Sequence, residues 1–434
     1  MFARNILAMA AATFAVTSIG TQTPTAAAPS PPSNPGARLT PATADQIRQA
    51  EALKPLQRLA SAAVSAGEHD FASQYAGARL QPDTGKVEIF LTDTAKGSRF
   101  LAALSKRDPG AETDRLVVKP AKYSERYLTA KSNLIMARAR AGKLPFTVYA
   151  TVLAPDGSGL TVEVPNPKQA RRALAGTAAS ADTEMFDNAV TVVKGERITS
   201  LSGRVDFPRL TGAGLNIENP AGYACTSGLP FRDKTINAYY ILTAFHCYDL
   251  FESIGTPSYP GLGQVTAISK PADASMVNIV APTPVGPPSN PGAFVAENGL
   301  PDEGSIGGKT ITAAGDTVAG ALVCHNGFIS YQNGDGVPCD WEVKGKTQYN
   351  LTAHGITYTV NGMRSEPKSP VAVAYHGDSG AAVYTLNGAY TVKGVGMVSA
   401  GGGCGETSSC TSMSFTNVSA VTAAFRNLTP MTSP

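Results

Sequence analysis

The spacing of apolar residues changes near residue 200, and this change divides the chain into two parts. Before it, apolar positions recur at helical spacing over 44–66 and again over 123–141. Each stretch precedes two strand-like runs joined by a turn, and then a shorter helical run. The paired runs are 71–80 with 86–91 and 147–153 with 160–164, and the shorter helical runs are 98–104 and 168–174. We therefore predict an α+β region made of two related helix–hairpin–helix subdomains.

Beyond residue 200, helical spacing disappears until the C-terminus, where 419–428 predicts a terminal helix. Many short β-rich runs at even spacing predict an antiparallel sandwich or barrel. These runs are 238–243, 265–268, 276–280, 310–312, 355–360, 371–374, 381–386 and 391–398. The proline-rich segment 281–291 is expected to be a surface loop without chemistry.

The first 28 residues have the pattern of an export signal. Arg4 gives a positive start, 6–19 is a short run of apolar and small residues, and three alanines at 26–28 offer a cleavage site. A membrane anchor is the alternative, but the run is too short and too rich in alanine, and no later stretch is long enough. We therefore expect a secreted, extracellular protein without a membrane partner, in which 29–43 is a disordered leader.

The cysteines agree with export, because an even number in a secreted chain predicts disulfides. All six lie after residue 224: Cys225, Cys247, Cys324, Cys339, Cys404 and Cys410. Six cysteines allow 15 pairings, and we predict the sequential pairing, which closes three local loops. The alternative is a metal site. No pair has the CxxC spacing that zinc prefers, so we expect no metal and no other cofactor.

The two parts also differ in charge. Residues 1–204 hold 25 Lys and Arg against 17 Asp and Glu, a net charge of +8. Residues 205–434 hold 11 against 16, a net charge of −5. This difference suggests two units that bind each other, with chance surface composition as the alternative. Neither part has the dense basic run of a nucleic-acid-binding protein, so nucleic acid is excluded as a partner.

A serine between two glycines carries the strongest chemical signal. The segment 377–380, Gly-Asp-Ser-Gly, is typical of a nucleophile on a tight loop, because glycine permits backbone turns that a Cβ resists. The amide N–H groups of Gly377 and Ser379 are candidates for an oxyanion hole, which stabilises the negative oxygen of an attacked carbonyl. The Ser379 hydroxyl is a weak nucleophile and needs a base.

His246 is the candidate base, and Asp273 is the candidate carboxylate. His246 ends an apolar strand beside Cys247. Its imidazole titrates near neutral pH, so it can accept the Ser379 proton and return it to a leaving amine. Asp273 precedes another apolar strand, where it can accept a hydrogen bond from the second ring nitrogen. Each residue alone is weak evidence, and only the combination is specific.

With these residues the chain resembles the chymotrypsin-fold serine proteases, and most closely the secreted bacterial streptogrisin and alpha-lytic protease group, which is made with an N-terminal pro-region. The segment 243–247, Thr-Ala-Phe-His-Cys, resembles the TAxHC motif of the family, and 377–380 resembles its GDSGG motif. The order of histidine, aspartate and serine matches, and so does the spacing of the three cysteine pairs. The resemblance covers about 205–430 strongly and the preceding region weakly.

This resemblance implies an all-β protease domain at 205–434, with two antiparallel β-barrels and a Ser-His-Asp triad in the cleft between them. It implies that 29–204 is a pro-region that assists folding, inhibits the enzyme and is then cut away, leaving a mature chain that starts near 203–212. The strand at 398–402 resembles the one that pairs with substrate backbone, which makes Ser399, Ala400 and Gly401 candidate substrate-binding residues. We also expect protein or peptide substrates and a monomer.

Some positions depart from the family pattern. Phe245 replaces a small residue before the histidine and can crowd the base, and Ala381 replaces a second glycine. His325 stands where an arginine commonly holds the aspartate before the nucleophile, which leaves Arg364 as a candidate substitute. The histidines other than His246, at 69, 325, 354 and 376, are expected on the surface or in loops, and the one at 376 is a candidate for lining the cleft.

Val373, six residues before the nucleophile, is the candidate floor of the specificity pocket. An apolar floor offers no counter-ion for a basic side chain. Val398 stands where glutamate-cutting relatives carry a histidine. We therefore expect cleavage after apolar or aromatic residues, because pocket shape decides such preferences.

Two other functions compete with this interpretation. An α/β-hydrolase needs its histidine after the serine, and no histidine follows residue 379. A secreted protease-like module that binds protein partners without activity is supported only by Phe245 and His325. Reaction of Ser379 with an organophosphate distinguishes an active protease from such a module.

Overall fold

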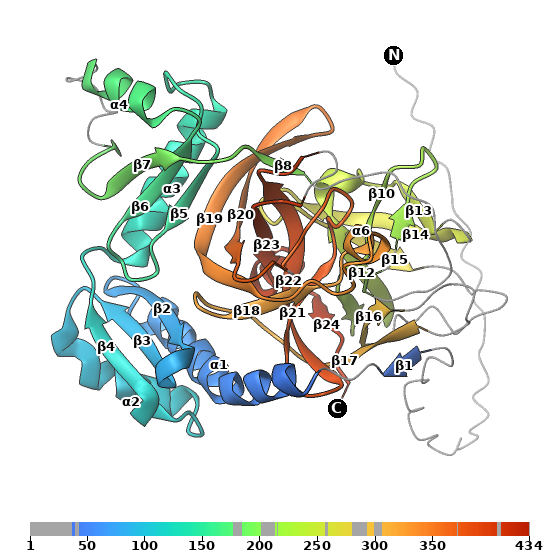
Figure 1. The fold of residues 1–434 in the computed structure, drawn as a ribbon, viewed down its shortest axis with the longest axis horizontal. Coiled ribbons are helices and arrows are strands. Elements are labelled where there is room, and N and C mark those ends of the chain that lie inside the picture. The colour runs from blue at the N-terminus through green and yellow to red at the C-terminus, as the bar shows by residue number, and fades with distance from the viewer. Residues whose placement is uncertain are drawn as a thin grey trace, which may run out of the picture. The chain divides into compact units, whose positions relative to one another are not determined.

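The computed structural model describes residues 37–39, 43–176, 185–200, 213–214, 216–256, 259–279, 293–298, 306–370, 372–405 and 409–433 (Figure 1). Several predicted features lie outside these residues: the export signal at 1–28, most of the leader at 29–43, the expected new N-terminus at 203–212 and the proline-rich loop at 281–291. Among the described helices, none is both long enough and apolar enough to cross a membrane.

The first subdomain begins with a long helix that covers a three-stranded sheet. Its elements are α1 (Ala44–Asp70), β2 (Tyr75–Gln81), β3 (Lys86–Leu91), α2 (Gly97–Arg107) and β4 (Leu116–Pro120). Thr43 and Gln46 start α1 with a capping box, in which each side chain accepts the backbone N–H of the other. The helix buries Leu56 and Leu59 in the same apolar core as Ile89 of β3.

The second subdomain repeats this element order, as the sequence predicts. It contains α3 (Glu125–Arg140), β5 (Ala150–Leu153), β6 (Leu160–Val164), α4 (Pro167–Gly176) and β7 (Val190–Lys194). In both subdomains the second hairpin strand also pairs in parallel with a later strand, β3 with β4 and β6 with β7. Neither β4 nor β7 is predicted, because both are short and lie beyond the hairpins that the turn signals mark.

The first barrel is an eight-stranded antiparallel sheet in the order β10-β9-β13-β14-β15-β12-β11-β24. Its strands are β9 (Asn216–Glu218), β10 (Ala224–Thr226), β11 (Pro230–Asp233), β12 (Ala238–Ala244), β13 (Ser253–Thr256), β14 (Tyr259–Ser269), β15 (Ala274–Ile279) and β24 (Leu428–Pro430). The pairing of β12 with β15 places Ala244 opposite Ala274. This register brings the ends of these two strands together.

The second barrel is a closed ring, in which β18, β19, β20, β23, β22 and β21 pair in turn and β21 returns to β18. These strands are β18 (Leu322–His325), β19 (Trp341–Ala353), β20 (Ile356–Pro367), β21 (Ala382–Leu386), β22 (Thr391–Gly402) and β23 (Ser412–Asn417). β16 (Phe294–Asn298) pairs with β17 (Ile306–Ala314), which joins β22. The predicted class, two antiparallel β-barrels preceded by an α+β region, is confirmed.

Two local predictions for the second barrel are wrong, and a third is correct only in part. Residues 372–374, which were expected to form a strand, do not, because their backbone groups bond side chains instead of a neighbouring strand. The Ala374 N–H donates to the Ser409 hydroxyl, and the Val373 carbonyl accepts a hydrogen bond from the His325 ring. A short helix, α6 (Phe328–Gln332), interrupts a region predicted to lack helices. The terminal helix α7 (Val418–Ala424) is shorter than expected.

Three strands from the N-terminal part join the sheet of the second barrel. β5 pairs antiparallel with β19, β8 (Ile198–Ser200) pairs antiparallel with β22, and β1 (Ala37–Leu39) pairs parallel with β17. In this way the long hairpin β19–β20, drawn in orange in Figure 1, meets the second subdomain through β5. The predicted domain boundary near residue 204 stays a prediction.

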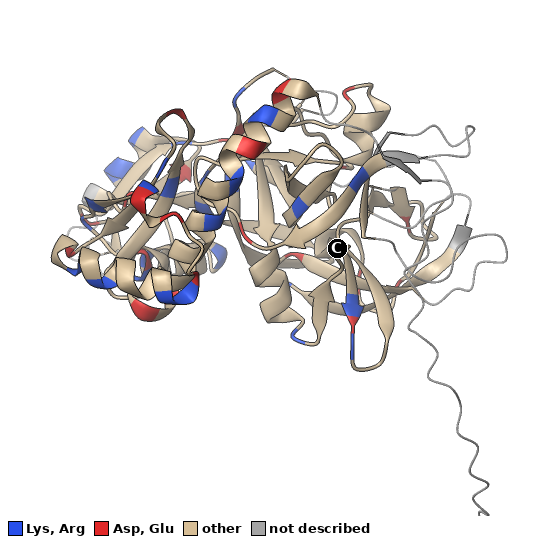
Figure 2. Ribbon diagram, turned by 90° about the horizontal axis from the view of Figure 1, so that it is seen from below, with Lys and Arg blue, Asp and Glu red and all other residues tan. Residues whose placement is uncertain are grey.

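Charged residues are more frequent along the ribbon of the N-terminal part than along the barrels (Figure 2). From the net charges, basic residues of the N-terminal part are expected to pair with acidic residues of the C-terminal part. Three ion pairs across this boundary have the opposite sense: Lys346 lies 2.8 Å from Glu68 and 2.5 Å from Glu125, and Arg364 lies 3.5 Å from Glu163. Local pairing at these positions is therefore not predicted by the net charges.

Candidate active site

The candidate base and carboxylate are brought together by the pairing of β12 with β15. His246 lies in a single 3-10 turn, η4 (Phe245–Cys247), directly after β12, and Asp273 lies directly before β15. The His246 N–H donates to Asp273 Oδ1 at 3.1 Å, and the ring Nδ1 lies 2.7 Å from Oδ2. Both side chains are buried. The register of β12 with β15 thus places two of the three candidate residues, His246 and Asp273.

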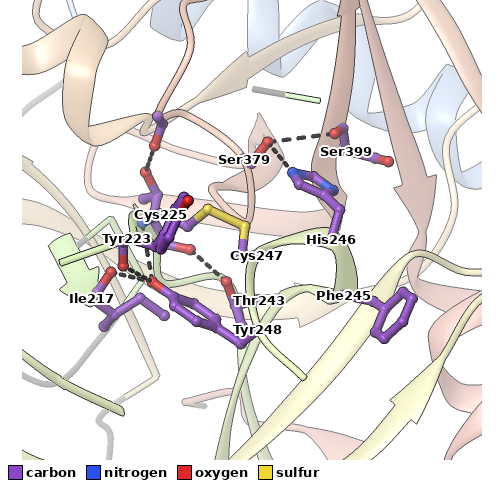
Figure 3. The surroundings of a disulfide bond; sticks show 12 residues. Ile217, Tyr223, Cys225, Thr243, Phe245, His246, Cys247, Tyr248, Ser379 and Ser399 are labelled. Carbon is purple, nitrogen blue, oxygen red and sulfur yellow. Dashed lines mark hydrogen bonds between the residues drawn. A yellow bond between two sulfur atoms is a disulfide. The ribbon is translucent and has the colours of Figure 1, made fainter. Parts of the chain in front are cut away.

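The candidate nucleophile comes from the second barrel. Ser379 Oγ lies 2.8 Å from His246 Nε2, as Figure 3 shows, although 133 residues separate the two along the chain. Because the ring accepts at one nitrogen only in its neutral form, a proton on Nδ1 directed at Asp273 leaves Nε2 free to accept the serine proton. All three predicted residues therefore form one continuous hydrogen-bonded chain.

The loop before Ser379 is held by the buried carboxylate of Asp378. Oδ1 accepts the N–H groups of Ile329 and Ser330 at 2.9 and 3.0 Å, both on α6. Oδ2 accepts the Ser330 hydroxyl at 2.6 Å and the Tyr375 N–H at 2.9 Å. These four donors give the loop before Ser379 a defined conformation.

Glycine is required at both flanks of this loop. Gly377 and Gly380 have φ angles of 107° and 90°, in the region that L-residues rarely adopt. A Cβ at Gly380 would lie 2.1 Å from the Thr226 carbonyl oxygen. Thr226 also donates its hydroxyl to the Gly377 carbonyl at 2.8 Å, and its N–H to the Ser379 carbonyl at 2.7 Å. The first barrel thereby fixes the loop around Ser379 through Thr226, which no sequence signal marks.

The candidate oxyanion hole has one amide whose direction can be deduced. The Asp378 carbonyl accepts the Ala381 N–H at 3.0 Å. In a trans peptide the N–H points opposite to the carbonyl, so the Ser379 N–H is directed away from Ala381. The Gly377 carbonyl, which accepts from Thr226, belongs to the peptide that follows and does not fix the direction of the Gly377 N–H. The role of Gly377 and Ser379 as an oxyanion hole stays a prediction.

Phe245 does not crowd the base. Its ring points away from the His246 ring (Figure 3) and is fully buried. It packs against Tyr358 and His354 of the β19–β20 hairpin, with both ring centroids at 5.2 Å. The large side chain thus fills space between the barrels instead of the site, and the expected obstruction is absent.

The two candidates for holding Asp378 have other partners. His325 is fully buried in β18, not on the surface as expected, and its ring nitrogens bond the Val373 carbonyl at 2.7 Å and the Gly327 N–H at 3.1 Å. Burial lowers its pKa from the ordinary value of 6.5, against the charge of Asp378. Arg364 pairs with Glu163 of β6. Burial raises the pKa of Glu163, against the charge of Arg364.

The candidate substrate strand is occupied by the chain itself. In β22, Ala400, Gly401 and Gly402 pair antiparallel with residues 200, 199 and 198 of β8. The Ser399 carbonyl lies 3.4 Å from Ser379 Oγ, and the Ser399 hydroxyl donates to Asp273 Oδ2 at 2.5 Å. Val373 is partly exposed beside this loop. Its role as the pocket floor, and the substrate contacts of 399–401, stay predictions.

The sequential disulfide pairing is confirmed. Cys225 bonds Cys247, Cys324 bonds Cys339, and Cys404 bonds Cys410. The first bridge holds the turn that carries His246, as Figure 3 shows. The sulfurs of this bridge and the His246 ring lie within 4.8 Å of one another. Disulfide sulfur carries no thiolate charge, so this group is not a metal site.

The buried His325 predicts a specific pH dependence of stability. Its Nδ1 accepts a hydrogen bond and its pKa is lowered in the folded state, so the unfolded chain binds this proton more strongly. The contribution of His325 is therefore fully present above about pH 6.5 and is lost as the pH falls toward the lowered pKa. We expect His325→Gln to flatten the fall of the unfolding free energy with decreasing pH below 6.5, measured by urea denaturation.

The exposed His69 provides the control, since His69→Gln should leave that slope unchanged. Equal slopes for wild type and His325→Gln would contradict a neutral, buried role for His325.

No protein-family model matches the chain, and no curated protein sequence matches it. Solved structures do match. Thermobifida fusca Protease A is 20% identical, with a TM-score of 0.38, over 51% of this chain and 99% of that chain. Nocardiopsis protease is 18% identical, with a TM-score of 0.37, over 51% of this chain and 99% of that one. A glutamic acid specific serine protease is 20% identical, with a TM-score of 0.37, over 50% and 99%. Each of these matches covers about half of this chain and almost all of the solved protease.

Proposed function

We propose that this chain is a secreted serine endopeptidase that is made as a zymogen. The observation that supports this most is the hydrogen-bonded chain from Asp273 through His246 to Ser379, which crosses from one barrel to the other. His246 Nδ1 lies 2.7 Å from Asp273 Oδ2, and His246 Nε2 lies 2.8 Å from Ser379 Oγ. All three side chains are buried, so they are arranged before any substrate binds. Such an arrangement has the geometry that nucleophilic catalysis by serine requires.

In the proposed reaction, Ser379 Oγ attacks the carbonyl carbon of a peptide bond while its proton moves to His246 Nε2. Asp273 stabilises the imidazolium that forms and keeps the ring oriented. The carbonyl oxygen becomes negative and accepts from the N–H groups of Gly377 and Ser379. His246 then gives its proton to the leaving amine, which leaves an acyl group on Ser379. Water deprotonated by His246 hydrolyses this ester and restores the serine.

The preference for apolar or aromatic residues before the cut is part of the same proposal. Val373 and Val398 carry no charge that would pair with a basic or acidic substrate side chain. Val398 belongs to β22, the strand that we propose pairs with substrate backbone, and its side chain is fully buried. Proteins and peptides outside the cell are the proposed substrates, and the proposed enzyme is a monomer without a cofactor.

We propose that residues 29–204 are a pro-region that assists folding and blocks the site. β8 occupies the edge of β22 on which a substrate strand would lie, so a substrate and β8 compete for the same backbone groups. β5 extends the β19–β20 hairpin by pairing with 347–349. Contacts of this extent would stabilise the hairpin while the second barrel closes, which is slow because its strands are distant in sequence.

Replacing the nucleophile tests the proposed chemistry. We expect Ser379→Ala to leave the fold intact and to lower peptide hydrolysis by at least about 10⁴-fold, because alanine lacks the hydroxyl to which the acyl group would be attached. Cleavage between the two parts should also be lost if it is autocatalytic. The measurements are hydrolysis of a chromogenic peptide, and mass and N-terminal sequencing of the secreted species.

Ser365→Ala removes a buried hydroxyl that bonds the Met413 carbonyl, away from His246, and serves as the matched control. Wild type should react with an organophosphate at Ser379. Wild type that neither hydrolyses peptides nor reacts would favour the inactive binding module instead.

A buried polar contact between the two parts tests the docking of the pro-region. The Ser132 hydroxyl of α3 lies 2.6 Å from Thr151 Oγ1 of β5 and 2.5 Å from Gln348 Oε1 of β19. Removing it leaves buried polar atoms with fewer partners. We expect Ser132→Ala, in the uncleaved Ser379→Ala chain, to lower the unfolding free energy by about 1–2 kcal/mol, measured by urea denaturation.

Ser105→Ala, on an exposed position of α2, should change the unfolding free energy by no more than a few tenths of that amount. An equal loss in both variants would show that the Ser132 contact does not contribute to docking.

A further inference from the structure

A tyrosine of the second barrel contacts the candidate carboxylate of the first. The Tyr358 hydroxyl, on β20, donates to Asp273 Oδ1 at 2.8 Å. Its side chain is almost completely buried. Burial, the charge of Asp273 and the hydrogen bond to it all raise the pKa of Tyr358, so the hydroxyl keeps its proton and donates it. No sequence signal marks this residue, because it lies in an ordinary strand.

Tyr358 is held in place by the unusual residue before the base. Its ring meets Phe245 edge to face, with the centroids 5.2 Å apart and the planes at 64°. His354, at the tip of the same hairpin, donates from Nε2 to the Phe245 carbonyl at 3.1 Å. The side chain that departs from the family motif is therefore the packing surface for Tyr358.

The backbone around Asp273 needs such support. Asp273 has a φ of 44°, a left-handed conformation that costs energy for a residue other than glycine. Two contacts from the second barrel hold the turn before it: the Asn361 N–H donates to the Pro271 carbonyl at 2.9 Å, and the Thr416 hydroxyl donates to the Ala272 carbonyl at 2.8 Å. Tyr358 and Ser399 reach the carboxylate itself: the Tyr358 hydroxyl donates to Oδ1, and the Ser399 hydroxyl donates to Oδ2.

The same apolar cluster extends into the N-terminal part. Ala150 of β5 and Ile198 of β8 are buried with Phe245, Tyr349 and Tyr358 in one group. The hairpin that bears Tyr358 is thus the element on which β5 docks. Tyr358 therefore packs in one cluster with β5, contacts Phe245 through its ring and bonds Asp273 through its hydroxyl.

We propose that Tyr358 is a positioning residue for Asp273, held by its packing on Phe245. It contacts neither substrate nor the reacting atoms, and it acts by fixing the carboxylate that orients His246. Without the Tyr358 hydroxyl, three donors instead of four would hold the carboxylate, so it would be oriented less firmly toward Nδ1 and would stabilise the imidazolium formed during the reaction less. This inference rests on the proposed function, since it assigns a role in the same site.

The direct test is Tyr358→Phe, which removes the hydroxyl and keeps the ring. We expect kcat for a peptide substrate to fall roughly tenfold, while KM stays within about twofold, because a hydrogen bond to a charged group is lost away from the substrate. Active sites are counted by organophosphate titration, so that misfolded protein does not enter kcat.

Tyr384→Phe is the matched control, because Tyr384 is also fully buried but lies in β21, outside the cluster. It should keep its kcat. Unchanged kcat in Tyr358→Phe, or an equal fall in both variants, would overturn the positioning role. Wild type without any activity would instead refute the proposed function.

A second measurement does not depend on maturation. In the full-length Ser379→Ala chain, the proton between His246 Nδ1 and Asp273 should give a far-downfield NMR resonance, because its acceptor is charged. We expect Tyr358→Phe to shift this resonance and Tyr384→Phe to leave it in place. A resonance that does not move in Tyr358→Phe would also overturn the inference.

Discussion

The structure of the site depends on one buried carboxylate. Asp273 is fully inaccessible, and a buried charge is costly unless it is hydrogen-bonded. Four donors satisfy it: the backbone N–H and the ring of His246, the hydroxyl of Tyr358 and the hydroxyl of Ser399. The first two donors come from the first barrel and the other two from the second. The charge is therefore satisfied only when the two barrels are in contact, and the same contact brings Ser379 to His246.

The loop before Ser379 also contains a buried carboxylate, Asp378, that is satisfied by hydrogen-bond donors. Asp378 is also fully buried, and its four donors are neutral groups from α6 and from its own loop. This explains why no arginine is needed where His325 stands. His325 instead bonds two backbone groups: the Val373 carbonyl, which precedes the loop, and the Gly327 N–H, at the start of α6. A neutral ring fits that task, because one nitrogen must donate and the other must accept.

The N-terminal part is bound to the elements that form the site. β8 lies on the strand proposed for substrate, and β5 lies on the hairpin that carries Tyr358. One set of contacts therefore covers the proposed binding edge and pairs with the hairpin whose Tyr358 bonds Asp273. Folding assistance and inhibition would then have a common structural origin, since both arise from strands added to the second barrel.

The amino-acid sequence alone predicted most of the element types, the sequential disulfide pairing and the three candidate residues that the structure brings together. Those features are local: turn signals delimit the strands, apolar spacing marks α1 and α3, and short cysteine separations favour local loops. Short motifs around His246 and Ser379 carry their chemistry in a few adjacent residues.

The contacts between distant strands could not be predicted from the sequence, because they depend on the three-dimensional arrangement of the barrels. Strand register and the facing of the two barrels set the hydrogen bonds that Tyr358 and Thr226 donate. They also set the direction of the Phe245 ring, the partner of Arg364 and the backbone groups that the His325 ring bonds. A tyrosine or threonine in an alternating strand looks the same in sequence whether it faces solvent or a buried carboxylate. Its role is set by a partner that lies far away along the chain, 85 residues in the case of Tyr358 and Asp273.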